Sequence, residues 1–194
     1  MIKAAFCDDD LSVLNELHVL MDNYRVERNQ EITYTAFHSP LELIAQIEKG
    51  MRFDILFLDV LMPGVNGIET AQEIREYDSA MKIIFLTSSA EYAVESYTVN
   101  AYFYQLKPIW PESFYRLMDS VLKECAQEQR RSLILRCKSG ITQISLDRLM
   151  YCEVQGRTLV FHMQNGEQME SMGSMEDLSG QLAKYNNFLR AHRS

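Results

Sequence analysis

In the first part of the chain, polar residues stand at the ends of short apolar runs: Asp8, Asp9, Asp59, Thr87 and Lys107. Short runs that are apolar at every position are typical of strands buried on both faces of a parallel sheet. The carboxyl ends of parallel strands meet at one edge of the sheet. The five side chains can therefore converge although they are far apart in the sequence.

The carboxylates and the lysine define the chemistry that such a cluster could perform. Three carboxylates in one cleft repel one another unless a cation lies among them, and hard oxygen ligands suit Mg²⁺. A carboxylate is also a nucleophile that can form an aspartyl phosphate, with a metal ion and a lysine neutralising the phosphoryl oxygens. Taken singly, each residue also has a structural interpretation. Asp8, Asp9 and Asp10 could cap a helix, Thr87 could end a strand and Lys107 could be a solvated surface residue.

The elements that must position these residues alternate between strand and helix. Five runs predict strands, namely Ile2–Phe6, Glu31–Phe37, Ile55–Leu58, Lys82–Thr87 and Tyr102–Leu106. Apolar residues at helical spacing predict the intervening helices, with a capping box at Ser39–Glu42 and a short helix at Ala90–Tyr97. The sequence therefore predicts an α/β fold, a doubly wound five-stranded parallel sheet with helices on both faces.

The rest of the chain predicts a smaller, mostly-β domain. A strand–turn–strand pattern is followed by three more strand-like runs, with Asn165–Gly166 as a hairpin turn and a capped helix at the end: Leu133–Lys138, Ile141–Ser145, Met150–Val154, Thr158–Met163, Gln168–Ser171 and Ser174–Lys184. We find no helix-turn-helix pattern. On composition alone, this domain could serve protein interaction or dimerisation.

Charge and composition divide the chain in the same way. Its 194 residues carry a net charge of −8, which is −10 over residues 1–124 (10 basic, 20 acidic) and +2 over residues 125–194 (9 basic, 7 acidic). This asymmetry suggests two domains with different partners. The four cysteines lack metal-ligand spacing, and no apolar run has the length of a membrane span or signal peptide. We therefore expect a reduced, cytoplasmic protein that does not insert into membranes.

Residues 1 to about 124 resemble the receiver domain of two-component response regulators, which has a flavodoxin-like fold. The resemblance rests on four segments: Phe6–Asp10, Asp59–Gly67, Phe85–Thr87 and Tyr104–Pro108. It implies a signalling protein and not an enzyme. Asp59 would accept a phosphoryl group from a phosphohistidine of a sensor histidine kinase.

The same resemblance implies a role for each remaining site residue. Asp9 would bind Mg²⁺ directly and Asp8 through water, with Asp59 and the backbone carbonyl of Leu61 as further ligands. Thr87 and Lys107 would contact the phosphoryl oxygens, and the Lys107–Pro108 bond matches a position where the family has a cis peptide. Tyr104 resembles the switch residue that turns inward on phosphorylation, or it is an ordinary half-buried aromatic. Phosphorylation is expected to promote a homodimer.

The second domain resembles the LytTR-type DNA-binding domain. The resemblance rests on Ile144–Glu153, the strand pair around Asn165–Gly166, Ser174–Leu182 and Phe188–Ser194. It implies binding of promoter DNA through loops between strands, with candidate contacts at Arg157, Thr158, His192 and Arg193. The less favoured alternative is that Arg157 is a solvated turn residue and Arg193 a frayed terminus.

The predicted organisation is therefore a receiver domain at 1–124, a linker at 125–131 and a LytTR-type domain at 132–194. The family pattern continues beyond Ser194, so we expect the second domain to be incomplete at its C-terminus. The predicted function is a DNA-binding transcription regulator controlled by phosphorylation. The alternative is a receiver-based signalling adaptor that pairs with protein rather than DNA.

Overall fold

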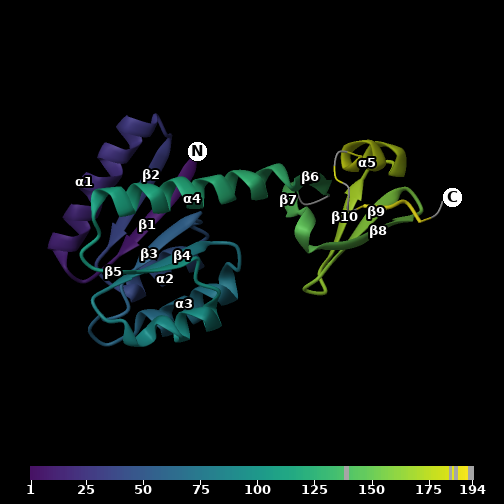
Figure 1. The fold of residues 1–194 in the computed structure, drawn as a ribbon. Coiled ribbons are helices and arrows are strands. Elements are labelled where there is room, and N and C mark those ends of the chain that lie inside the picture. Colours follow the sequence, from purple (N-terminus) through teal and green to yellow (C-terminus); the bar gives the residue numbers. More distant parts are fainter. Residues whose placement is uncertain (138–139, 184, 186–187, 192–194) are drawn as a thin grey trace. The chain divides into compact units, whose positions relative to one another are not determined.

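The computed structural model describes residues 1–137, 140–183, 185 and 188–191, with the backbone alone at 128–130 (Figure 1). The chain divides into two compact units, Met1–Lys123 and Glu124–Ser194. Each unit has its own core and is described by itself.

The first unit is built on a five-stranded parallel sheet with the strand order β2-β1-β3-β4-β5. Its strands are β1 (Ile2–Cys7), β2 (Ile32–Phe37), β3 (Ile55–Leu58), β4 (Lys82–Thr87) and β5 (Phe103–Leu106). The carboxyl ends are in register: Cys7 lies beside Leu58, and Thr87 lies beside Leu106. The predicted α/β fold is confirmed, and the residues that follow these strands meet at one edge of the sheet.

Helices cover both faces of this sheet (Figure 1). They are α1 (Leu11–Arg28), α2 (Pro40–Glu48), α3 (Gly67–Tyr77) and α4 (Pro111–Arg130). On one face, the Phe114 ring of α4 stacks on Phe57 of β3 at 5.6 Å and meets Tyr24 of α1 edge-on at 6.3 Å between centroids. On the other face, Leu43 of α2 and Ile74 of α3 are buried in one apolar cluster with sheet residues. Because β3 is apolar on both sides, it is enclosed between the two helical layers.

Two local predictions in this unit were wrong. The short helix expected at Ala90–Tyr97 is instead a pair of 3₁₀ turns, η1 (Glu91–Ala93) and η2 (Glu95–Val99). Ser96 and Val99 are buried in them, whereas Val94 and Tyr97 are exposed, so this segment lacks the apolar stripe that stabilises an α-helix by packing.

The other wrong prediction concerns the capping box at Ser39. In the described part of the chain, the Ser39 side chain makes no cap hydrogen bond. The helix nevertheless begins at Pro40, whose fixed φ favours the first helical position. The backbone N–H of Leu43 donates to the backbone carbonyl of Ser39 at 3.2 Å. The start of α2 therefore depends on backbone geometry rather than on a side-chain cap.

The second unit is mostly β, as predicted. An antiparallel pair, β6 (Ser132–Cys137) and β7 (Gly140–Ser145), precedes the single turn η3 (Leu146–Arg148). A three-stranded antiparallel sheet follows in the order β10-β9-β8, formed by β8 (Leu149–Gln155), β9 (Thr158–Met163) and β10 (Gln168–Met172). The helix α5 (Met175–Leu182) is capped by Ser174, whose hydroxyl oxygen accepts from the N–H of Asp177 at 3.1 Å.

One apolar cluster forms the core of this second unit. Its buried members come from the strands, from η3 and from α5, and include Leu133, Leu135, Ile144, Leu146, Leu149, Leu159, Phe161, Met163 and Leu178. The predicted hairpin turn joins β9 to β10, with Gly166 at a φ of 83° that favours glycine. The segment predicted as a linker, 125–131, is helical as far as Arg130 because α4 continues to that residue. Among the described residues, no helix is both long enough and apolar enough to cross a membrane.

Candidate functional site

The five polar residues singled out in the sequence lie at the carboxyl edge of the parallel sheet. Asp8 and Asp9 follow β1, Asp59 follows β3, Thr87 ends β4 and Lys107 follows β5. Backbone hydrogen bonds continue the ladder past the strand ends. The Asp59 N–H donates to the Cys7 carbonyl at 2.9 Å, and the Lys107 N–H donates to the Thr87 carbonyl at 2.8 Å. The sheet therefore fixes the backbone from which these side chains project.

Lys107 links the two buried carboxylates. Its Nζ donates to Asp8 Oδ2 at 2.7 Å and to Asp59 Oδ2 at 2.6 Å. The side chains of Asp8 and Asp59 are 3% and 6% exposed, so bulk water hardly solvates either charge. One ammonium group therefore compensates two buried carboxylates, and Asp9 adds a third, exposed one.

The second oxygen of each buried carboxylate is held by the backbone. Asp8 Oδ1 accepts from the N–H of Asp10 at 3.0 Å, and Asp59 Oδ1 accepts from the N–H of Leu61 at 3.1 Å. Each aspartate thus bonds the N–H two residues ahead, as in an Asx turn. Both carboxylates are held at both oxygens, which fixes their orientation in the cleft.

Burial and charge pairing oppose each other at this site. Burial raises the pKa of Asp8 above its ordinary value, although the hydrogen bonds from Lys107 and Asp10 act in the opposite direction. Burial lowers the pKa of Lys107, but its hydrogen bonds to Asp59 and Asp8 outweigh burial and raise that pKa on balance. The lysine therefore remains charged, and its ammonium group stabilises the buried carboxylates of Asp8 and Asp59.

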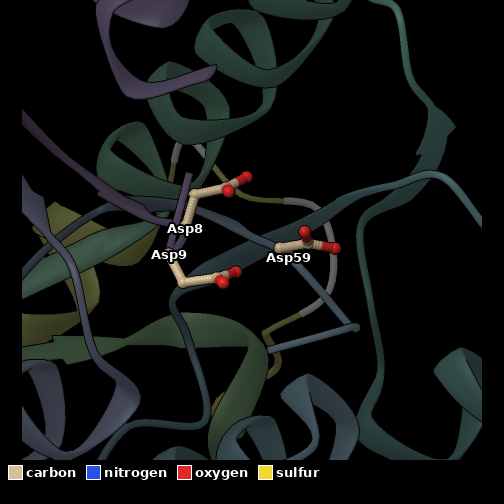
Figure 2. Close-up of side chains that lie close together, drawn as sticks. All are labelled: Asp8, Asp9 and Asp59. Atoms are coloured by element: carbon tan, nitrogen blue, oxygen red, sulfur yellow. The ribbon is translucent and has the colours of Figure 1, made fainter. Parts of the chain in front are cut away.

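The three carboxylates fit a divalent cation. Oxygens of Asp8, Asp9 and Asp59 all lie within 4.8 Å of one another, and Figure 2 shows the three side chains pointing to the same side. Carboxylate oxygens are the ligands that Mg²⁺ prefers, and it keeps water in its remaining positions. The backbone carbonyl of Leu61 stays a prediction as a further ligand.

The loop after Asp59 requires a glycine at position 67. A Cβ atom there would lie 2.1 Å from the backbone oxygen of Asp59 and 2.8 Å from Cα of Val60. The N–H of Gly67 donates to the Val60 carbonyl at 2.9 Å, and Asn66 caps α3 by accepting from the N–H of Ile68. The first turn of α3 therefore packs directly on the backbone that carries Asp59.

Thr87 and Tyr104 lie on neighbouring strands beside this cluster. Thr87 is fully buried, and Tyr104 is half-buried with its ring 6.0 Å from that of Phe85. The hydroxyl of Tyr104 donates to the carbonyl of Ser89 at 2.7 Å, which ties β5 to the loop that follows Thr87. The Lys107–Pro108 peptide bond is cis, as the receiver resemblance implied.

The candidate DNA contacts lie in the second unit. Gly156 and Arg157 form the turn between β8 and β9, where Gln155 pairs with Thr158. Arg157 is exposed and Thr158 is half-buried. His192 and Arg193 lie outside the described residues, so these two predictions have no structural counterpart.

Two contacts of the first unit were not predicted from the sequence. Asp10 caps α1 and also bonds Asp8 through its backbone N–H. Its position before an apolar helical pattern is a recognisable cap signal, but the contact with Asp8 is not visible in the sequence. Arg75 donates to the carbonyls of Met81 and Val99, both at 2.8 Å, and so joins α3 to the end of η2. No local pattern predicts that contact.

Comparisons with known proteins identify the family to which the first unit belongs. The family described as response regulator receiver domain matches residues 5–119. The transcriptional regulatory protein NatR of Bacillus subtilis is 26% identical over 195 residues, which cover 100% of this chain and 81% of that protein. The accessory gene regulator protein A of Staphylococcus epidermidis is 29% identical over 206 residues, covering 100% of this chain and 85% of that protein.

A further relative and two solved structures match mainly the first unit or part of the chain. The sensory transduction protein LytT of Oceanobacillus iheyensis is 30% identical over 148 residues, which cover 73% of this chain and only 60% of that protein. The response regulatory domain of mrkE from Klebsiella pneumoniae has a TM-score of 0.58 at 23% identity, covering 65% of this chain and 99% of that one. The Vibrio cholerae chemotaxis protein CheY4 has a TM-score of 0.54 at 25% identity, covering 62% and 98%. By fold, site geometry and sequence, this chain belongs to the response regulator receiver domain family.

Proposed function

We propose that Asp59 accepts a phosphoryl group from a phosphohistidine of a sensor histidine kinase, and that phosphorylation controls a DNA-binding second domain. The observation that supports the first part is the contact of Lys107 with both Asp8 and Asp59. This geometry places a nucleophilic carboxylate and a cation within hydrogen-bond distance of each other. Such an arrangement suits the transfer of an anionic group.

In the proposed reaction, an oxygen of Asp59 attacks the phosphorus atom of phosphohistidine. A new O–P bond forms, the N–P bond breaks and the imidazole nitrogen takes the electron pair. Because Lys107 already donates to Asp59, it is a candidate donor to the oxygens of the transferred phosphoryl group. The hydroxyl of Thr87 is a second candidate donor to them. A Mg²⁺ ion held by Asp8, Asp9 and Asp59 would supply the positive charge that an anionic donor needs in order to approach.

We propose Tyr104 and Thr87 as the residues that report phosphorylation to the surface. Tyr104 bonds the carbonyl of Ser89, two residues after Thr87, so a shift of Thr87 toward a phosphoryl group would change this contact. The adjoining surface carries exposed apolar side chains on η1–η2 and β5, namely Val94, Tyr97, Phe103 and Leu106. A surface of this kind supports association with a second copy of the chain.

Addition of beryllofluoride, a mimic of the phosphoryl group, is expected to shift the protein from monomer toward homodimer. The shift follows if the mimic contacts Thr87 and Lys107 differently in the two conformations, since only such a difference can move the equilibrium. Sedimentation velocity at micromolar protein measures it, with Asp59→Asn as the unresponsive control. If the wild type stays monomeric with the mimic bound, phosphorylation does not act through dimerisation.

DNA binding is proposed for the second unit. Its support is the net charge of +2 over residues 125–194, the exposed Arg157 at a hairpin turn and the similarity to the transcriptional regulatory protein NatR. Arg157→Ala is expected to weaken binding to a duplex from upstream of the chain's own gene by about tenfold. If Arg157 contacts a phosphate, the slope of log affinity against log salt concentration should also become shallower by about one.

Fluorescence anisotropy over a range of salt concentrations makes this measurement. Arg116→Ala is the matched control, because Arg116 is an exposed arginine of α4 in the acidic first unit. If the Arg157 and Arg116 variants bind the duplex with equal affinity, Arg157 does not contact the DNA. Failure of the phosphorylated wild type to bind the duplex would favour the adaptor function instead.

A further inference from the structure

Asp10 is the third aspartate after β1, and its carboxylate is directed into helix α1 rather than toward the other acidic groups. Asp10 Oδ1 accepts from the N–H of Ser12 at 2.8 Å and from the Ser12 hydroxyl at 2.7 Å. These bonds fix the backbone conformation of Asp10 at the start of the helix. Its side chain is thereby engaged in capping.

The backbone N–H of the same residue points the other way, toward the site. It donates to Asp8 Oδ1 at 3.0 Å, while the opposite oxygen of Asp8 accepts from Lys107. The cap of α1 is therefore connected to the orientation of a candidate metal ligand through two hydrogen bonds and one backbone segment. Loss of the cap would free the peptide that holds Asp8 Oδ1.

We propose that Asp10 is a positioning residue for the divalent cation, acting through its cap and backbone N–H and not through its negative charge. The inference rests on the proposed function, because it assumes that Asp8 helps to hold the cation. Direct electrostatic action is the alternative. Asp10 is exposed, so water and salt screen its charge, whereas the hydrogen bond to the buried Asp8 is shielded.

The test separates charge from capping by comparing side chains at this position. Asp10→Asn and Asp10→Ser remove the charge but retain a good cap, whereas Asp10→Ala removes both. Isothermal titration calorimetry with MgCl₂ is expected to show affinity within about twofold of the wild type for Asn and Ser. The Ala variant should bind about tenfold more weakly, the lower end of the loss seen when a ligand's supporting contact is removed.

Two controls keep the result interpretable. Ser174→Ala removes the equivalent cap from α5 in the second unit and should leave Mg²⁺ affinity unchanged. If Asp10→Ala does not fold, Asp10→Gly replaces it, because glycine is tolerated at the cap position but supplies no acceptor oxygen.

Three results would contradict the proposal, and each would show a different part of it to be wrong. If the wild type does not bind Mg²⁺, the metal site of the proposed function is wrong. If the wild type binds and Asp10→Ala or Asp10→Gly binds equally well, Asp10 has no positioning role. If Asp10→Asn is as weak as Asp10→Ala, the charge of Asp10 matters and the capping explanation is wrong.

Discussion

Asp59→Asn is expected to abolish phosphorylation by acetyl phosphate, whereas the wild type gains the mass of one phosphoryl group. An amide lacks the anionic oxygen that attacks phosphorus, so the substitution removes the nucleophile and preserves the shape of the side chain. The Asn oxygen can still accept from the N–H of Leu61, but its NH2 group, in place of Oδ2, cannot accept from Lys107. Intact-protein mass spectrometry in the presence of Mg²⁺ makes the measurement.

Asp54→Asn is the matched control for this experiment. Asp54 lies just before β3 and Asp59 just after it, so the two variants test opposite ends of one strand. Asp54 accepts from the N–H of Lys3 at 2.8 Å, a bond that Asn also makes, and the control should gain the same mass as the wild type. EDTA should suppress the gain in both. A full gain of mass by the Asp59→Asn protein would show that another residue is phosphorylated.

Lys107→Met is expected to lower the free energy of unfolding by about 3 kcal/mol at pH 7, the cost typical of removing one partner from a buried ion pair. Methionine retains the length and apolar stem of the lysine but leaves two buried carboxylates without their cation. Urea denaturation measures the loss. Lys107→Arg, which retains the charge, should lose much less, and Mg²⁺ should restore part of the stability of the methionine variant.

The pH dependence of the methionine variant distinguishes charge repulsion from poor packing. In the wild type, burial already raises the pKa of Asp8 above 3.8, and Lys107 opposes this increase. Without Lys107 the pKa of folded Asp8 should rise further, so the folded state binds more protons than the unfolded state. The stabilisation by protonation is full below the unfolded pKa and is lost as the pH rises through the raised folded pKa. The deficit of the variant should therefore shrink as the pH falls from 7 toward 5, and a deficit independent of pH would indicate packing.

The sequence predicted the sheet well because its strands are encoded locally. Ile55–Leu58 is apolar at every position, which at that length is typical of a strand enclosed between two layers. The topology then places Asp8, Asp59 and Lys107 at one edge without any further information. The sequence does not show which carboxylate oxygen of Asp8 or Asp59 bonds which donor, because that depends on the exact positions of the side chains.

The 3₁₀ turns at Glu91–Val99 show where local reasoning failed. A short helix was predicted there, but tertiary contacts decide the conformation. Arg75 holds the carbonyls at the end of this segment, and Tyr104 holds the carbonyl of Ser89 before it. Both partners are distant in sequence, so neither contact could be anticipated from the segment itself.

The position of Lys107 in the chain has a consequence for protein synthesis. Lys107 is 99 positions after Asp8 and 48 positions after Asp59, and it follows the last strand of the sheet. At a synthesis rate of about 5–20 residues per second, Asp8 precedes its lysine by roughly 5–20 s. During that interval the nascent chain carries the acidic pair without its internal cation. We therefore expect that the first four strands alone do not bury these carboxylates as the finished domain does until Lys107 has left the ribosome.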